Sequence, residues 1–218
     1  MSTLYTNARF WSAGQEIFHD LLVKDSIILA TGEQTKEFTA ETTIDLNGAF
    51  VIPAFLDGHA HPIFAGREAA GPKINGINSI EEIKAQVKAF AQANPTTPWI
   101  IGGAYEAAII EGGDFDATWL DEVVSDRPVV LHAVDHHTIW VNSKAIEVAG
   151  ITSATKDPQG GTIARNSDGS AKGTLREPSA MALVLNHAPA NTIESDIAAI
   201  TYACAEYRKV GVIAAIDS

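Results

Sequence analysis

The chain has 218 residues, of which 46% are hydrophobic and 19% charged, a composition typical of a folded globular protein rather than of a disordered one. Fifteen basic residues against twenty-seven acidic ones give a net charge of -12, which repels phosphate backbones and anionic lipids, so we expect no nucleic-acid partner and no membrane partner. The single cysteine, Cys204, excludes an intrachain disulfide, and the absence of a secretion-signal pattern or of an apolar run near roughly 18 residues predicts a cytoplasmic protein.

The first 50 residues are predicted to form short strands joined by tight turns. Branched aliphatic residues fill both ends of 20–30 around a polar break at 24–26, which is typical of a β-hairpin. Residues 42–46 predict a further strand, and Asn47-Gly48 is a turn signal. Because no helical period is present, residues 1–50 are interpreted as a small sheet module.

Residues 50–56 then form a nearly continuous apolar run that ends in Asp57-Gly58. A short run that is apolar on both faces predicts a buried strand of a barrel. Pro53 cannot donate a hydrogen bond to a neighbouring strand, so we expect it near the start of the strand or at an irregular entry.

Beyond this strand, amphipathic helices alternate with further strands. Residues typical of helix N-caps predict four helix starts, at Ser79, Asp116, Asn142 and Asn191. Apolar runs at 99–103, 128–134 and 212–216 predict strands, whereas 152–174 is rich in Gly, Ser, Asp and Asn and predicts an extended loop or loose hairpin. This alternation predicts a mainly parallel α/β architecture.

His59 and His61 follow the predicted barrel strand directly. Residues two apart in an extended chain point to the same side, and active sites of barrels lie at the carboxyl ends of the strands. Two imidazoles at that position predict a site for a divalent metal such as Zn, which can activate water. In the alternative, one is a turn residue and the other a hydrogen-bonded core residue; the placement after an apolar strand favours the metal site.

The string VIPAFLDGHAHP, residues 51–62, resembles the first barrel strand of the amidohydrolase superfamily, with Ala54 in place of the usual Gly. The strings at 134–145, 160–165, 173–177 and 211–217 resemble those of its YtcJ-like branch, which includes N-substituted formamide deformylases. Together they cover most of the chain in the right order. The resemblance implies the N-terminal part of a TIM-like (β/α) barrel (51–218), preceded by a small β-sandwich module (1–50), with a large insertion at about 65–190.

The resemblance also implies further site residues. Glu177 ends a string of the branch and is expected as a catalytic residue, acting as a base, a metal ligand or a substrate contact; the alternative is a surface salt bridge with Arg176. His137 matches the histidine of the branch and is expected to contact substrate. Trp140 is expected to shape the substrate pocket, although an aromatic residue on a strand is more often core. Asp217 ends a strand and either points into the barrel mouth or caps a turn.

The implied function is metal-dependent hydrolysis of a non-peptide C–N bond, as in an N-substituted formamide or small amide, with one or two metal ions in the complete enzyme. The family's remaining ligands lie on later strands, so these 218 residues are interpreted as a fragment that is inactive alone. Two alternatives remain open. One is an inactive or non-enzymatic half-barrel that forms a homo-oligomer, or needs a partner, through exposed barrel edges. The other is a deaminase of the same superfamily.

Overall fold

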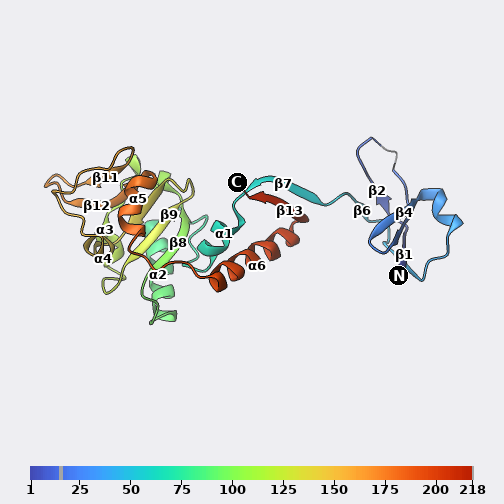
Figure 1. The fold of residues 1–218 in the computed structure, drawn as a ribbon, viewed down its shortest axis with the longest axis horizontal. Coiled ribbons are helices and arrows are strands. Elements are labelled where there is room, and N and C mark those ends of the chain that lie inside the picture. Colours follow the sequence, from blue (N-terminus) through green and yellow to red (C-terminus); the bar gives the residue numbers. More distant parts are fainter. Residues whose placement is uncertain (15–16, 218) are drawn as a thin grey trace. The chain divides into compact units, whose positions relative to one another are not determined.

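The computed structural model describes residues 1–14 and 17–217 (Figure 1), which divide into two compact units. Unit 1 contains residues 1–58 and 208–216, and unit 2 contains 59–207 together with Asp217. Unit 1 therefore extends beyond the module predicted at 1–50, because residues 51–58 and a late segment of the chain join it.

Unit 1 contains a four-stranded sheet in the order β4-β3-β1-β5 and a separate pair, β2-β6. In the larger sheet, β1 pairs antiparallel with β3 and parallel with β5. The strands are β1 (Ser2–Thr6), β2 (Arg9–Phe10), β3 (Leu21–Lys24), β4 (Ile27–Thr31), β5 (Thr42–Asp45) and β6 (Phe50–Val51), and a short 3-10 helix, η1 (Gly32–Glu37), follows β4. The small sheet module expected at the N-terminus is thus present.

The predicted hairpin is β3-β4, and its turn is formed by Asp25 and Ser26. Both residues have positive φ, 48° and 66°, which is the backbone of the two-residue turns whose twist matches that of paired strands. Asp25 also accepts a hydrogen bond from the amino group of Met1 at 2.8 Å, which ties the tip of the hairpin to the chain terminus.

Pro53 interrupts the strand predicted over residues 50–56. The run divides into β6 and β7 (Phe55–Ala60), with Pro53 between them, because proline cannot contribute to a ladder of backbone hydrogen bonds. Among the described residues, β7 pairs with one strand, β13 (Val212–Asp217). The prediction of a buried strand was therefore wrong for this chain: Leu56 is 73% exposed.

Unit 2 is built on a five-stranded sheet in the order β11-β12-β10-β9-β8. The strands are β8 (Ile100–Tyr105), β9 (Val129–Ala133), β10 (Thr138–Val141), β11 (Thr162–Arg165) and β12 (Ala171–Arg176). β8 and β9 are parallel, whereas the other three pairs are antiparallel. The fold is mixed α/β and not mainly parallel as predicted, because turns too short for a parallel crossover join β9 to β10 and β11 to β12. Within the described residues the strands form no closed barrel.

The helices begin largely where the capping residues predict. They are α1 (Pro62–Ala69), α2 (Ile80–Ala93), α3 (Ala117–Asp121), α4 (Ser143–Val148), α5 (Glu177–Leu185) and α6 (Ile193–Lys209), with 3-10 turns η2 (Ala107–Ile109) and η3 (Glu111–Gly113). The side chains of Ser79, Asp116 and Asn142 accept backbone hydrogen bonds as N-caps. At α6, Thr192 exchanges these bonds with Ser195, one position after the predicted pair.

The core of unit 2 consists of two clusters, and β10 contributes to both. Trp140 belongs to the cluster that contains Ile83 of α2, whereas Ile139 belongs to the cluster that contains Val184 of α5. Since neighbouring strand residues point to opposite faces, helices cover the sheet on both faces. A sheet packed in this way gives a rigid support for the loops at its ends.

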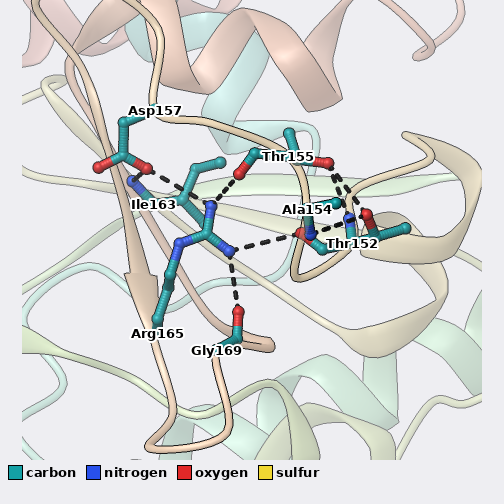
Figure 2. A network of polar contacts seen from close by, with 7 residues as sticks. All are labelled: Thr152, Ala154, Thr155, Asp157, Ile163, Arg165 and Gly169. Atoms are coloured by element: carbon teal, nitrogen blue, oxygen red, sulfur yellow. Dashed lines mark hydrogen bonds and ion pairs between the residues drawn. The ribbon is translucent and has the colours of Figure 1, made fainter.

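The segment predicted as a loop or hairpin is the β11-β12 hairpin with the loop before it, and Arg165 organises it (Figure 2). The guanidinium of Arg165 donates to the carbonyl oxygens of Gly169, Thr152 and Thr155. Asp157 lies 3.5 Å from the same guanidinium and accepts a hydrogen bond from the Ile163 amide. One charged side chain therefore connects the hairpin with the loop that precedes it.

Candidate metal and substrate site

His59 and His61 lie side by side where β7 ends and α1 begins. Their ring centroids are 5.2 Å apart and the ring planes are inclined by 79°. His59 belongs to β7, and His61 is the residue that precedes α1. The expectation from the spacing, that the two side chains lie close together, agrees with this geometry.

Asp217, the last residue of β13, approaches the same pair. Its Oδ1 atom lies 3.8 Å from Nδ1 of His61. Histidines that bind metals commonly offer their second ring nitrogen to a carboxylate, which fixes the ring and makes the other nitrogen a better ligand. Of the two expectations for Asp217, its position beside His61 agrees with the one that points it to the strand-end site.

The pair fits a zinc-type metal in part. Imidazole nitrogen is a preferred ligand of zinc, but a catalytic zinc normally has three protein ligands. No group of three or more His, Cys, Asp or Glu side chains suited to a metal is found within residues 1–14 and 17–217. His59 and His61 thus offer two of the donors that such a site requires.

Glu68 of α1 is a second acidic side chain, and Phe64 and His136 connect it to this pair. Phe64 lies between two histidines: its ring centroid is 6.0 Å from that of His61 and 6.2 Å from that of His136. Nδ1 of His136 lies 3.4 Å from Oε1 of Glu68, whose side chain is only 17% exposed. A row of side chains therefore extends from the histidine pair to Glu68.

Burial raises the pKa of Glu68 to about 7, because removing water from around a carboxylate disfavours its charged form. His132 shows the opposite direction: burial, with a smaller contribution from His136, lowers its pKa to about 4. A carboxyl group that titrates near neutral pH is characteristic of functional sites.

Sequence analysis missed Glu68, because no motif includes it. A signal was nevertheless present in the Gly102-Gly103 pair of β8. A Cβ atom built on Gly103 would lie 2.4 Å from Oε1 of Glu68, so the carboxyl group occupies the space that any other residue there would fill. Consecutive glycines in a strand often mark such a close approach.

His137 and Glu177, predicted from separate strings, form a pair. Nδ1 of His137 lies 3.0 Å from Oε2 of Glu177, and the backbone N–H of Glu177 donates to the carbonyl of His137 at 2.6 Å. The hydrogen bond that His137 donates to the Glu177 carboxylate raises the pKa of His137. The alternative partner, Arg176, lies instead 2.6 Å from Asp114.

Glu177 also has a positive φ of 69°. A residue with a side chain adopts this conformation at a cost, and such strain is concentrated at functional sites. The conformation brings the carboxylate to His137, and the catalytic role of Glu177 stays a prediction.

Trp140 is fully buried, and its indole N–H donates to the carbonyl of Asp116 at 2.9 Å. Its ring packs against Phe115 with centroids 4.9 Å apart. This placement agrees with the alternative interpretation of Trp140 as a core residue that supports the sheet; a contact with substrate stays a prediction.

The chain matches the model of the amidohydrolase family over residues 42–218 and belongs to that family. The resemblance to its YtcJ-like branch is confirmed by curated relatives. The chain is 35% identical over 173 residues to the putative amidohydrolase YtcJ of Bacillus subtilis, a match that covers 77% of this chain and 32% of YtcJ.

Other relatives have different names. The protein LONG AFTER FAR-RED 3 of Arabidopsis thaliana is 33% identical over 83% of this chain and 32% of its own length. The N-substituted formamide deformylase of Arthrobacter pascens is 27% identical over 80% of this chain and 33% of its own length. The chain thus spans about a third of the length of these relatives.

A solved structure has the same fold. An uncharacterized metal-dependent hydrolase from Pyrococcus furiosus superposes with a TM-score of 0.66 at 21% identity, over 99% of this chain and 44% of the other.

In the part of the chain that the structure describes, no helix has the length and apolar character needed to cross a membrane.

Proposed function

We propose that the chain contributes to a metal-dependent hydrolase that cleaves a C–N bond outside peptides, in an N-substituted formamide or another small amide. The observation that carries the proposal is the adjacent pair His59 and His61 at the end of β7, with ring centroids 5.2 Å apart. Membership of the amidohydrolase family and the likeness to an N-substituted formamide deformylase support the choice of substrate.

In this proposal His59 and His61 hold a divalent metal, with zinc the best match to imidazole ligands. When bound, such a metal lowers the pKa of water and polarises a carbonyl oxygen. Asp217 would orient the ring of His61 from 3.8 Å. Glu177, hydrogen-bonded to His137, would serve as the proton-accepting carboxylate, with His137 in contact with the substrate.

A second candidate is a non-enzymatic half-barrel that self-associates. One observation favours it: the strands β7 and β13 pair only with each other in the described residues and expose large apolar side chains. These are Phe55, Leu56, Ile213 and Ile216. Apolar edge strands of this kind favour pairing with another chain. For a deaminase, no comparable observation is present.

Metal titration of the purified 218-residue chain tests the histidine pair. We expect the metal-free chain to bind Zn²⁺, measured by calorimetry, and Co²⁺, measured by its absorption spectrum. His59→Ala and His61→Ala should each weaken binding by at least about tenfold, because second-shell changes alone cost that much. His187→Ala, remote from the motif, is the control. Equal binding by all three variants and the unchanged chain would overturn the proposal.

Hydrolysis of a panel of N-formylamines tests the reaction. We expect no turnover by the 218-residue chain, and turnover by an extended chain that carries the later strands of the family. Turnover by the short chain that His59→Ala abolishes would contradict the expectation that it is inactive alone. An extended, metal-loaded chain that leaves every N-formylamine intact would refute the substrate class.

A further inference from the structure

Glu68 stands out among the carboxylates of unit 2 because it is largely buried and no lysine or arginine forms an ion pair with it in the described residues. Its side chain is 17% exposed, and it lies against the backbone of β8 at Gly103. Within residues 1–14 and 17–217, its one ion-pair partner is His136, and no Lys or Arg side chain pairs with it. A half-buried carboxylate normally has a permanent cation or several hydrogen-bond donors nearby.

The backbone on both sides holds this arrangement in place. His136 has a positive φ of 56°, and its N–H donates to the carbonyl of Ala133 at 3.0 Å. This tight turn after β9 presents the imidazole to Glu68. On the other side, a Cβ atom at Gly103 would lie 2.6 Å from Cδ of Glu68, so β8 leaves room for the carboxyl group alone.

The position of Glu68 relative to the histidine pair suggests its role. From His61 to Phe64 to His136, successive ring centroids are 6.0 and 6.2 Å apart, and Glu68 contacts the far end of this row. If the carbonyl of an amide lies at His59 and His61, its amide nitrogen lies there too, and only the nitrogen substituent can extend along this row. The group that meets Glu68 would then be a hydrogen-bond donor or a cation carried by that substituent.

We propose that Glu68 and His136 form a subsite for the nitrogen substituent of the substrate, where Glu68 accepts hydrogen bonds from an ammonium or other N–H group carried by that substituent. The exposed ring of Phe64 forms the apolar wall between this subsite and the histidine pair. A primary ammonium group supplies both the charge and the donors that Glu68 lacks. The inference rests on the proposed function, because the substituent extends toward this subsite only when the amide carbonyl lies at the histidine pair.

Binding of benzylammonium chloride to the isotope-labelled 218-residue chain, followed by NMR, tests the proposal. We expect chemical-shift changes centred on Glu68, Gly103 and His136. Glu68→Gln should raise the Kd by about tenfold or more, since it removes a charged hydrogen bond. Glu147→Gln, a change to an exposed carboxylate paired with Lys144 at 2.8 Å, is the matched control and should leave the Kd unchanged.

Benzyl alcohol, which has the same ring without the charge, should bind more weakly than benzylammonium. An unchanged Kd in Glu68→Gln, equal binding of the alcohol, or shifts confined to other surfaces would each overturn the inference. If Glu68→Gln fails to fold, as the NMR spectrum itself shows, His136→Ala gives the same test at a partly exposed position. Zinc titration of the same samples separates the two proposals. Zinc binding without amine binding would overturn only the proposed subsite, and amine binding without zinc binding would overturn only the proposed metal site.

Discussion

At the scale of single residues, the structure places three imidazole–carboxylate contacts near strand ends of unit 2. His61 faces Asp217, His136 faces Glu68, and His137 faces Glu177. Imidazole and carboxylate together can both donate and accept a proton near neutral pH, which general acid–base chemistry requires. Of the six residues, Glu68 is the one for which burial has the clearest measurable consequence.

The stability of the protein should depend on pH through Glu68. Its folded pKa is raised from 4.5 to about 7, so the unfolded chain releases this proton at lower pH than the folded chain does. The contribution of Glu68 to stability is therefore greatest below about pH 4.5 and falls as the pH rises from 4.5 to about 7. Glu68→Gln should remove this fall and gain on the order of 1–2 kcal/mol above pH 7, after allowance for solvent screening.

Urea denaturation of both proteins across this pH range measures the effect. Glu147→Gln is the control for the loss of one surface charge and should retain the pH dependence of the unchanged protein. Identical slopes for the unchanged protein and Glu68→Gln would show that the carboxyl group titrates normally.

At the scale of elements, Asn142 forms more hydrogen bonds to distant segments than a helix N-cap needs. Its side-chain oxygen accepts from the amides of Val129 and Ala145, and its amide group donates to the carbonyls of Val124 and Arg127. It is fully buried. One side chain thus caps α4 and also connects β9 with the segment that follows α3.

Asn142→Ala should destabilise the protein by about 3–5 kcal/mol, because it leaves buried backbone groups unpaired at several places at once. Urea denaturation measures the change in the free energy of unfolding. The control is Asn166→Ala, at an exposed position whose side chain donates to Ser170, and it should cost less than about 1 kcal/mol. Equal effects of the two changes would mean that the buried network contributes little.

Local sequence signals were sufficient to predict many of the helix starts and turns. Caps such as Ser79 and Asn142, and the polar break at 24–26, act within a few residues, so the sequence around them was sufficient. Contacts between distant segments gave no such signal. The pairing of β10 with β12, and the approach of Glu68 to His136, depend on how the sheet closes, which short-range patterns do not determine.

The candidate site divides in the same way. His59 and His61 were predictable because their spacing alone brings them together. His137 and Glu177 were suggested by separate strings, and the structure shows that they touch. Glu68 was missed because its role depends on the space beside Gly103. That space is formed where α1 packs against β8, so the sequence of neither element alone indicates it.

At the scale of the whole chain, the exposed apolar strands predict self-association. β7 and β13 have large apolar side chains open to solvent, including Leu56 at 73% and Ile213 at 70%. We expect the 218-residue chain to form dimers or larger species at micromolar concentration, because apolar strand edges pair readily. Light scattering coupled to size-exclusion chromatography measures the mass.

Leu56→Lys combined with Ile213→Lys should shift the chain toward monomer, since edge charges oppose pairing. Leu29→Lys, at an exposed position of β4 (46%), is the control for added charge elsewhere. A monomeric unchanged chain would mean that these strands are not sufficient to drive association.

The sheet of unit 2 has a consequence for synthesis of the protein. All five strands come from one uninterrupted stretch of the chain, from β8 at Ile100 to β12 at Arg176. Most strands that pair in the sheet also follow one another in the sequence. A ribosome therefore releases a foldable sheet before α6 and β13 exist, whereas β7 must wait for its partner about 150 residues later. During that interval His59 lies on a strand without its partner, so the histidine pair should reach its final geometry only after β13 has been synthesised.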